Sequence, residues 1–216
     1  MEAVEDMTTM AAVAVTSKRI RVRFYPLLFA ALTALILTPA GRAQEIAAQL
    51  DPAQTKIEFK LGSTLHTVEG TFKLKSGAIR FDPSTGKMSG SIIVDATSGE
   101  SGNGGRDRRM HREILESGKY PEIVFTPIQA KGAFNPKGPS KLEVSGQIRL
   151  HGEDHDMTLP IDIQPAGPQL QMTMHITIPY IKWGLKNPST FILRASDKVE
   201  IDIHAVGQVV TDETPR

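Results

Sequence analysis

Two histidines on either side of a short acidic turn are the side chains whose spacing best suits chemistry. The run from His151 to His155 (HGEDH) joins two strand-like segments, so a hairpin with its tip at 152–154 could set both imidazoles opposite each other across the strands. With Glu153, Asp154 or Asp156 beside them, the pair could hold a transition metal in a metal-dependent module or enzyme. Two surface histidines beside a turn explain the same run, which matches neither helical zinc-protease motif, so we assign no metal ligand.

Other motifs for catalysis are incomplete. The segment 99–103 (GESGN) lacks the second glycine of a nucleophile elbow. The glycine-rich loop runs into Arg106-Asp107 without the Lys-Ser/Thr step of a phosphate loop or the third glycine of a dinucleotide site. The chain has no cysteine, which excludes disulfides, thiolate metal sites and cysteine nucleophiles. We therefore predict no catalytic residue, no cofactor and no enzyme activity.

Charge identifies no partner. The chain has 25 Lys and Arg against 24 Asp and Glu, a formal net charge of +1. A nearly neutral balance of this kind gives no reason to expect a nucleic-acid partner. The sequence leaves the oligomeric state open, a dimer included.

The first 43 residues are predicted to be a targeting segment. A basic stretch over 18–23 precedes an apolar run, Phe24 to Leu37, that is short for a membrane span. Small residues at Gly41 and Ala43 suit cleavage after Ala43. An uncleaved anchor is the alternative. We expect residues 1–43 to be a signal peptide with an N-terminal extension, and residues 44–216 to form one periplasmic or secreted domain without a stable membrane span.

Alternation of apolar and polar residues dominates the predicted domain. Such a period of two is typical of strands with one buried and one wet face. The alternating segments are 57–61, 68–74, 142–150, 157–163, 170–178 and 199–205. Turn-forming runs such as 82–86 and 135–139 separate them. These short connections predict antiparallel neighbours.

A helix is predicted for one segment, Arg106 to Glu116. Met110, Ile114 and Leu115 form an apolar stripe that should face the strands, and the glycine-rich residues 98–105 suggest a flexible lead-in. The remaining face is basic. Its charges could form a solvated surface paired with neighbouring acids, or could lie at a barrel mouth or near lipid headgroups. The arginines concerned are Arg106, Arg108, Arg109 and Arg112.

A single short helix cannot cover this many half-apolar strands, so the sheet must close on itself. We predict an all-β fold, an antiparallel β-barrel of about eight strands with one short helix inserted around residues 106–116. Alternation alone favours an interior filled by its own side chains. A hollow interior would suit an apolar guest. Trp183 could anchor the core or touch such a guest.

Strand phase also selects the residues that point into the barrel. A slip of one residue in register would turn each of them outward. The candidate lining residues are Phe59, Leu61, Phe72, Leu74, Ile92, Val94, Met110, Ile114, Phe125, Val144, Ile148, Leu159, Ile161, Met172, Met174, Ile176 and Trp183.

Several separated motifs resemble one known family. They are VEGTFKLKSGAIRFDP after Leu65-His66, the SGESGN and RDRRMH runs, LESGKYPEIVF, and SGQIRLHGEDHDMTLPI. Together they make the chain similar to YceI-like proteins over about residues 50–210. The chain departs from the usual family pattern at 149–155 and at 180–184, which indicates a divergent branch.

The resemblance implies a lipocalin-like, usually exported barrel whose apolar interior holds a polyisoprenoid such as a prenol or a quinone tail. On this basis we expect non-catalytic binding of a long apolar lipid, for carriage or storage outside the cytoplasm. Two alternatives stay open: the metal-dependent use of His151 and His155, and a stress-related structural protein with a filled barrel.

Overall fold

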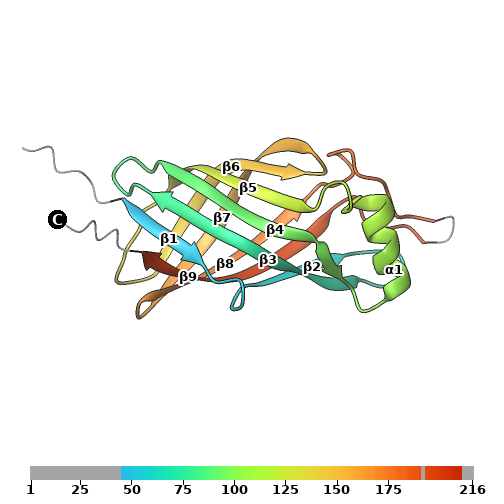
Figure 1. Ribbon diagram of the computed structural model, residues 1–216, viewed down its shortest axis with the longest axis horizontal. Coiled ribbons are helices and arrows are strands. Elements are labelled where there is room, and N and C mark those ends of the chain that lie inside the picture. The colour runs from blue at the N-terminus through green and yellow to red at the C-terminus, as the bar shows by residue number, and fades with distance from the viewer. Residues whose placement is uncertain (1–44, 191–192, 211–216) are drawn as a thin grey trace, which may run out of the picture. The chain divides into compact units, whose positions relative to one another are not determined.

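The structure is a computed structural model that describes residues 45–190 and 193–210. The predicted targeting segment, residues 1–43, lies outside the described residues. Strands make up most of the described chain, as Figure 1 shows. They are β1 (Ile46–Leu50), β2 (Lys56–Leu61), β3 (Val68–Phe81), β4 (Met88–Glu100), β5 (Glu122–Lys131), β6 (Ser140–Leu150), β7 (Glu153–Ala166), β8 (Gln169–Ile178) and β9 (Val199–Val210).

The sheet closes on itself as an antiparallel barrel. Its strands follow the order β3-β2-β9-β8-β7-β6-β5-β4, and β4 pairs back to β3. Strand β1 shares one barrel position with β2: both lie between β3 and β9, β1 beside their C-terminal halves and β2 beside their N-terminal halves. The predicted lipocalin-like antiparallel barrel of about eight strands is therefore confirmed.

The apolar residues that alternate along each strand point into the barrel, and the polar residues between them point outward. Along β6 every second residue from Ser140 to Leu150 is buried. The register carries this phase across the sheet, because Phe125 pairs with Ile148, which is buried as well. Strand β3 shifts its inward phase at a bulge between Leu74 and Ser76, after which Gly77 and Phe81 are buried. Each strand thus turns its apolar face to a common interior, the main source of folding free energy.

The end of the barrel remote from the helix is filled by side chains. Phe81 and Phe134 meet edge to face there, with ring centroids 5.9 Å apart. Val144, Leu142 and Met172 belong to the same buried cluster. At this end the interior is filled by its own side chains, the arrangement that alternation alone favours.

The helical segment lies at the opposite end of the barrel (Figure 1). The α-helix α1 (Gly104–Arg109) continues into a π-helical turn, η1 (Met110–Ile114). The side chain of Asn103 accepts hydrogen bonds from the backbone N–H groups of Gly105 and Arg106, 3.0 and 3.1 Å long, and so fixes the helix start. The helix is confirmed close to its predicted position. The predicted flexible lead-in was wrong, because β4 continues to Glu100 and Asn103 is the cap.

One further observation concerns membranes. In the described part of the chain, no helix is both long and apolar enough to cross a bilayer.

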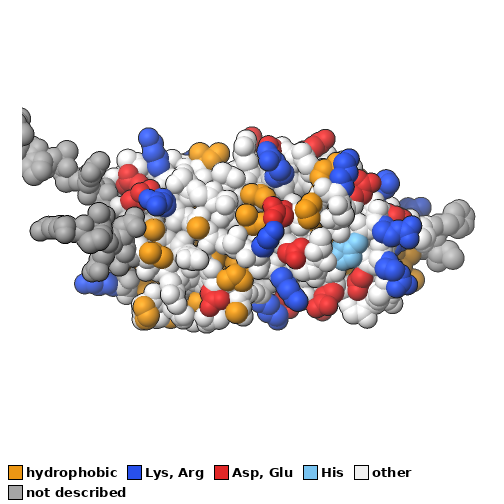
Figure 2. Space-filling view, viewed as in Figure 1, with side chains coloured by type: hydrophobic (Ala, Val, Ile, Leu, Met, Phe, Trp, Pro, Cys, Tyr) orange, Lys and Arg blue, Asp and Glu red, His pale blue; other side chains and the backbone are white. Residues whose placement is uncertain are grey.

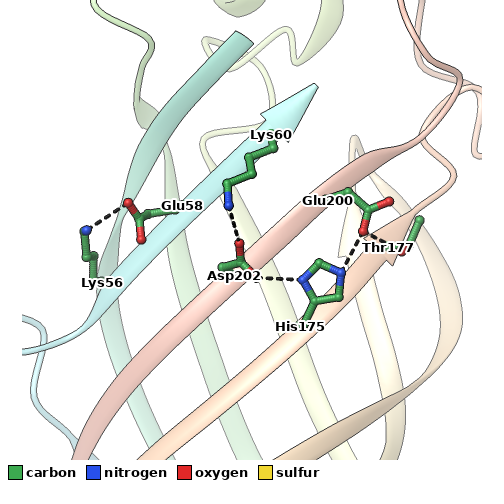
Figure 3. A network of polar contacts seen from close by, with 7 residues as sticks. All are labelled: Lys56, Glu58, Lys60, His175, Thr177, Glu200 and Asp202. Atoms are coloured by element: carbon green, nitrogen blue, oxygen red, sulfur yellow. Dashed lines mark hydrogen bonds and ion pairs between the residues drawn. The ribbon is translucent and has the colours of Figure 1, made fainter. Parts of the chain in front are cut away.

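The outer face of β2, β9 and β8 carries a charged network (Figure 3). The imidazole of His175 lies between two carboxylates, with Nδ1 2.6 Å from Asp202 Oδ1 and Nε2 2.8 Å from Glu200 Oε2. Lys60 reaches the other oxygen of Asp202 at 3.0 Å, and the hydroxyl of Thr177 donates to Glu200 at 2.9 Å. These cross-strand pairs join three neighbouring strands on their solvent face.

Candidate functional site

An apolar cavity of about 330 Å³ lies between the helical segment and the strand ends beneath it. Its roof is formed by residues of α1 and η1, and its walls by β2, β3, β5, β6, β8, β9 and the β8–β9 connection. The apolar lining consists of Phe59, Leu61, Val68, Phe72, Met110, Ile114, Leu115, Ile123, Leu150, Ile178, Leu185, Pro188, Leu193, Ala195, Val199 and Ile201. Such a lining suits the apolar part of a ligand.

The cavity reaches only the outermost inward-facing residues of each strand. On β2, Leu61 and Phe59 line it, whereas the next inward residue, Ile57, belongs to the buried core. The same change from cavity to core occurs on the other walls. It falls between Ile201 and Ile203, Phe72 and Leu74, Ile123 and Phe125, Leu150 and Ile148, and Ile178 and Ile176. Since inward residues of a strand repeat about every 7 Å, the cavity is one or two side-chain layers deep.

Two phenylalanines form part of the floor. The rings of Phe59 and Phe72 are tilted at 45° with centroids 5.4 Å apart. Strand β3 makes room for them with Gly70, where a Cβ atom would stand 2.4 Å from Cζ of Phe59. The aromatic pair therefore separates the cavity from the packed layers below it.

Ser101, just after β4, locks the first turn of the roof in place. Arg106 donates from Nε to the Ser101 hydroxyl oxygen and from Nη2 to the Ser101 carbonyl oxygen, both at 2.7 Å. Asp107 accepts the Ser101 backbone N–H at 3.0 Å and also the Ser101 hydroxyl. The arginine-aspartate pair of the sequence motif thus holds the helix to the strand end.

Two further contacts hold the rest of the roof. His111 lies 2.8 Å through Nε2 from the Gly99 carbonyl, which can only accept, so this nitrogen carries the proton. Its Nδ1 lies 2.9 Å from the Ser117 hydroxyl. After η1, Glu116 Oε2 lies 3.0 Å from Nε2 of His151 in the β6–β7 turn. The roof is thereby joined to two different parts of the barrel rim.

Polar groups are concentrated at the rim of the cavity. Ser63, His66, Ser101, Arg106 and Arg109 line it, together with the phenol of Tyr180. The phenol donates a 2.6 Å hydrogen bond to the Ser196 carbonyl. Burial, with a smaller contribution from Asp197, raises the pKa of Tyr180 to about 12, so the phenol stays neutral and serves as a structural donor.

The structure separates His151 from His155, so the arrangement with the two imidazoles opposite each other, which the sequence allowed, does not form. In the observed register His155 pairs with Ile148, and His151 lies in the turn with φ of 54°. His155 stacks on Trp183 with centroids 4.3 Å apart and planes 3° from parallel, and its Nε2 is buried without a hydrogen-bond partner. Within residues 45–190 and 193–210, no group of three His, Cys, Asp or Glu could hold a metal.

The sequence-based lining candidates fall into three groups. The structure brings five of them to the cavity and places the others in the buried core or packed against it. The cavity group is Phe59, Leu61, Phe72, Met110 and Ile114. The buried core holds Leu74, Phe125, Val144, Ile148, Leu159, Met172 and Ile176. Ile92, Val94, Ile161, Met174 and Trp183 are half-buried and pack against that core.

Many residues that line the cavity were not among the candidates chosen from strand phase. Leu150, Ile178, Val199 and Ile201 lie on the apolar phase of their strands, at the ends nearest the helix. What they share is a position near the end of their strand, on the side of the barrel that holds the helical segment. Sequence reasoning had no way to choose this end of the barrel over the other.

Comparisons with known proteins agree with this geometry. The YceI-like domain family matches residues 49–207. A UPF0312 protein of Vibrio parahaemolyticus is 27% identical over 137 residues, which are 62% of this chain and 70% of the relative. Another from Vibrio cholerae is 23% identical over 193 residues, 82% of this chain and 94% of the relative.

Two solved structures share the fold. BcnA of Burkholderia cenocepacia superposes with a TM-score of 0.60 at 19% identity, over 73% of this chain and 98% of that one. A polyisoprenoid binding domain from Saccharophagus degradans gives a TM-score of 0.55 at 16% identity, over 76% and 99%. Because the family match spans residues 49–207, which include nearly the whole barrel, this chain belongs to the YceI-like family.

Proposed function

We propose that this protein binds a long apolar lipid, a polyisoprenoid or prenyl quinone, for carriage or storage outside the cytoplasm. The observation that carries the proposal is the apolar cavity beneath the helical roof of a closed barrel. The similar Saccharophagus degradans domain is described as polyisoprenoid binding, which supports the ligand class. Export rests on the targeting segment predicted in residues 1–43.

Binding would be driven by removal of apolar ligand surface from water, worth about 25 cal/mol per Å² before ordering costs. No step of this process needs a catalytic group. The polar rim around Ser101 and Arg106 suits the headgroup end of the lipid, and the apolar floor suits the tail.

The cavity also sets how much of the tail can enter. Its 330 Å³ lies at the low end of the roughly 300–1,000 Å³ usual for small-molecule pockets. A few isoprene units would fill it. A longer inserted chain would have to displace the floor at Phe59 and Phe72 and open the packed layers below.

Identification of bound lipid tests the proposal directly. Native mass spectrometry of the protein purified under mild conditions, followed by solvent extraction, should show a prenyl lipid. Delipidated protein should take up geranylgeraniol or a short-chain prenyl quinone. The variant Met110→Glu, which puts a carboxylate into the roof, should lose uptake, whereas the neighbouring Glu113→Gln should retain it. No co-purifying lipid and no uptake of either probe would overturn the proposal.

A further inference from the structure

The connections at the cavity end of the barrel carry an excess of basic residues. In an antiparallel barrel the β2–β3, β4–β5, β6–β7 and β8–β9 connections lie at the same end, and residues of the first, second and fourth line the cavity. The β4–β5 connection has five basic and three acidic residues, and the β8–β9 connection has four and one. The other two connections carry no Lys, Arg, Asp or Glu.

This charge is local to the mouth. Residues 45–210 carry 19 basic and 19 acidic side chains, so the barrel is neutral as a whole, while these four connections together have an excess of five positive charges. The three connections at the opposite end, β3–β4, β5–β6 and β7–β8, carry two basic residues and one acidic residue. Figure 2 shows blue side chains gathered at the end where Figure 1 places α1.

Several of these charges are free to meet a partner. Arg108, Arg112, Lys182 and Lys186 are exposed, and within the described residues none of them forms an ion pair. Leu65 in the β2–β3 connection is 69% exposed, the highest value among the exposed large apolar side chains, and its neighbour His66 lines the cavity. Thr64 donates its backbone N–H to the carbonyl of Arg194 at 3.0 Å, so the connection that exposes Leu65 lies beside the basic β8–β9 connection. An apolar residue next to basic ones suits the boundary between anionic headgroups and acyl chains.

We propose that this basic end docks on an anionic lipid bilayer, with Leu65 inserted and the cavity mouth facing the lipid. The inference rests on the proposed function, because docking in this orientation lets an apolar ligand pass between bilayer and barrel without crossing water. Basic side chains are attracted to an anionic surface within about a Debye length of it. The excess of basic residues in these connections therefore favours reversible docking that weakens as ionic strength rises.

Vesicle flotation of the protein purified from its host cell tests the proposal. We expect binding to phosphatidylcholine vesicles containing phosphatidylglycerol, loss of binding at high salt, and little binding to pure phosphatidylcholine. Arg108→Glu with Arg112→Glu should weaken binding at least tenfold, as should Lys182→Glu with Lys186→Glu on the other connection. Leu65→Ser should weaken it several-fold.

A matched control separates local from total charge. Lys131→Glu with Lys137→Glu changes the net charge equally at the opposite end of the barrel and should leave flotation unchanged. Equal loss in this control, equal binding to neutral vesicles, or no binding at all would overturn the docking proposal.

Lipid uptake from a cyclodextrin complex of geranylgeraniol needs no vesicle and therefore tests the proposed function separately. Uptake without vesicle binding would overturn docking alone. Vesicle binding without uptake would leave docking standing and count against carriage.

Discussion

Phe59 lies at the boundary between the cavity and the packed core of the barrel. One side of its environment is the cavity, and the other is the core that includes Ile57 and Leu74. Its ring is 6% exposed and fits only because Gly70 has no side chain. The length of ligand tail that the protein accepts should therefore depend on this ring.

We predict that Phe59→Ala extends the cavity and shifts the preferred ligand to longer prenyl chains. The stability cost should be at or below about 3 kcal/mol, the lower end for loss of a buried Phe, because part of the ring already faces open space. Binding of a series from geraniol to longer prenols, measured by competition, checks the shift.

Phe81→Ala is the matched control at the filled end of the barrel. Phe81 is 8% exposed and packs on Phe134, so its loss should destabilise the protein without changing chain-length preference. An unchanged preference in Phe59→Ala would show that Phe59 does not limit the depth.

His175 should make stability depend on pH. Its hydrogen bond to Asp202 is the main reason that the pKa of His175 is raised above the ordinary 6.5. Because the folded pKa exceeds the unfolded value, this contribution is complete below about pH 6.5 and is lost as pH rises through the folded pKa. The pKa of Asp202 is lowered from 3.8, chiefly by the same bond, so its contribution is lost as pH falls through the folded pKa.

We therefore predict that His175→Gln destabilises the protein most between about pH 4 and 6.5 and least in alkaline buffer. The effect should stay below about 1 kcal/mol, because the imidazole is 60% exposed and well screened. Urea unfolding at several pH values checks it. His204→Gln, an exposed histidine on β9 for which the described residues show no ion pair, should show no such window.

At the scale of elements, the roof is a preformed part of the barrel. Asn103 caps α1, Arg106 and Asp107 hold Ser101, and His111 bonds to Gly99. Most of these partners belong to β4 or the residues directly after it. We expect the rate of ligand exchange to depend on how firmly these contacts hold the roof to the end of one strand.

We predict that Asp107→Asn speeds ligand exchange several-fold and lowers the melting temperature only slightly. The substitution weakens a charge-assisted contact to Ser101 but keeps the shape of the side chain. Stopped-flow release of a fluorescent prenyl analogue measures the change. Glu113→Gln removes only the exposed contact with Arg109 and should leave exchange unchanged; equal release rates in both variants would show that Ser101 does not govern the roof.

The sequence predicted elements well where local chemistry decides them. Period-two alternation located most strands, and the Met110-Ile114 stripe located the roof. Asn103 could have been recognised as a cap, but the glycines around it suggested a loop instead. The sharing of one barrel position by β1 and β2, and the register that separates His151 from His155, depend on pairing between distant strands. No local pattern specifies such pairing.

At the scale of the molecule, the barrel is packed at one end and hollow at the other. Alternation could not reveal this difference, because Leu142 at the filled end and Leu150 beside the cavity occupy the same phase of the same strand. What differs is the element that covers each end: Phe134 fills one interior, whereas the helical segment spans the other. A ligand in the cavity can therefore add contacts at the hollow end, whereas the filled end has no room for one.

This asymmetry predicts where a ligand stabilises the protein. At a free concentration of geranylgeraniol about 100 times its Kd, linkage adds about 2.7 kcal/mol, which for a domain of this size raises the melting temperature by about 5–10 °C. Protection from amide hydrogen exchange should increase in α1, η1 and the β8–β9 connection, whose residues touch the cavity. The β5–β6 connection at the filled end should exchange as before. Protection spread evenly over both ends, or confined to the filled end, would place the ligand outside the cavity.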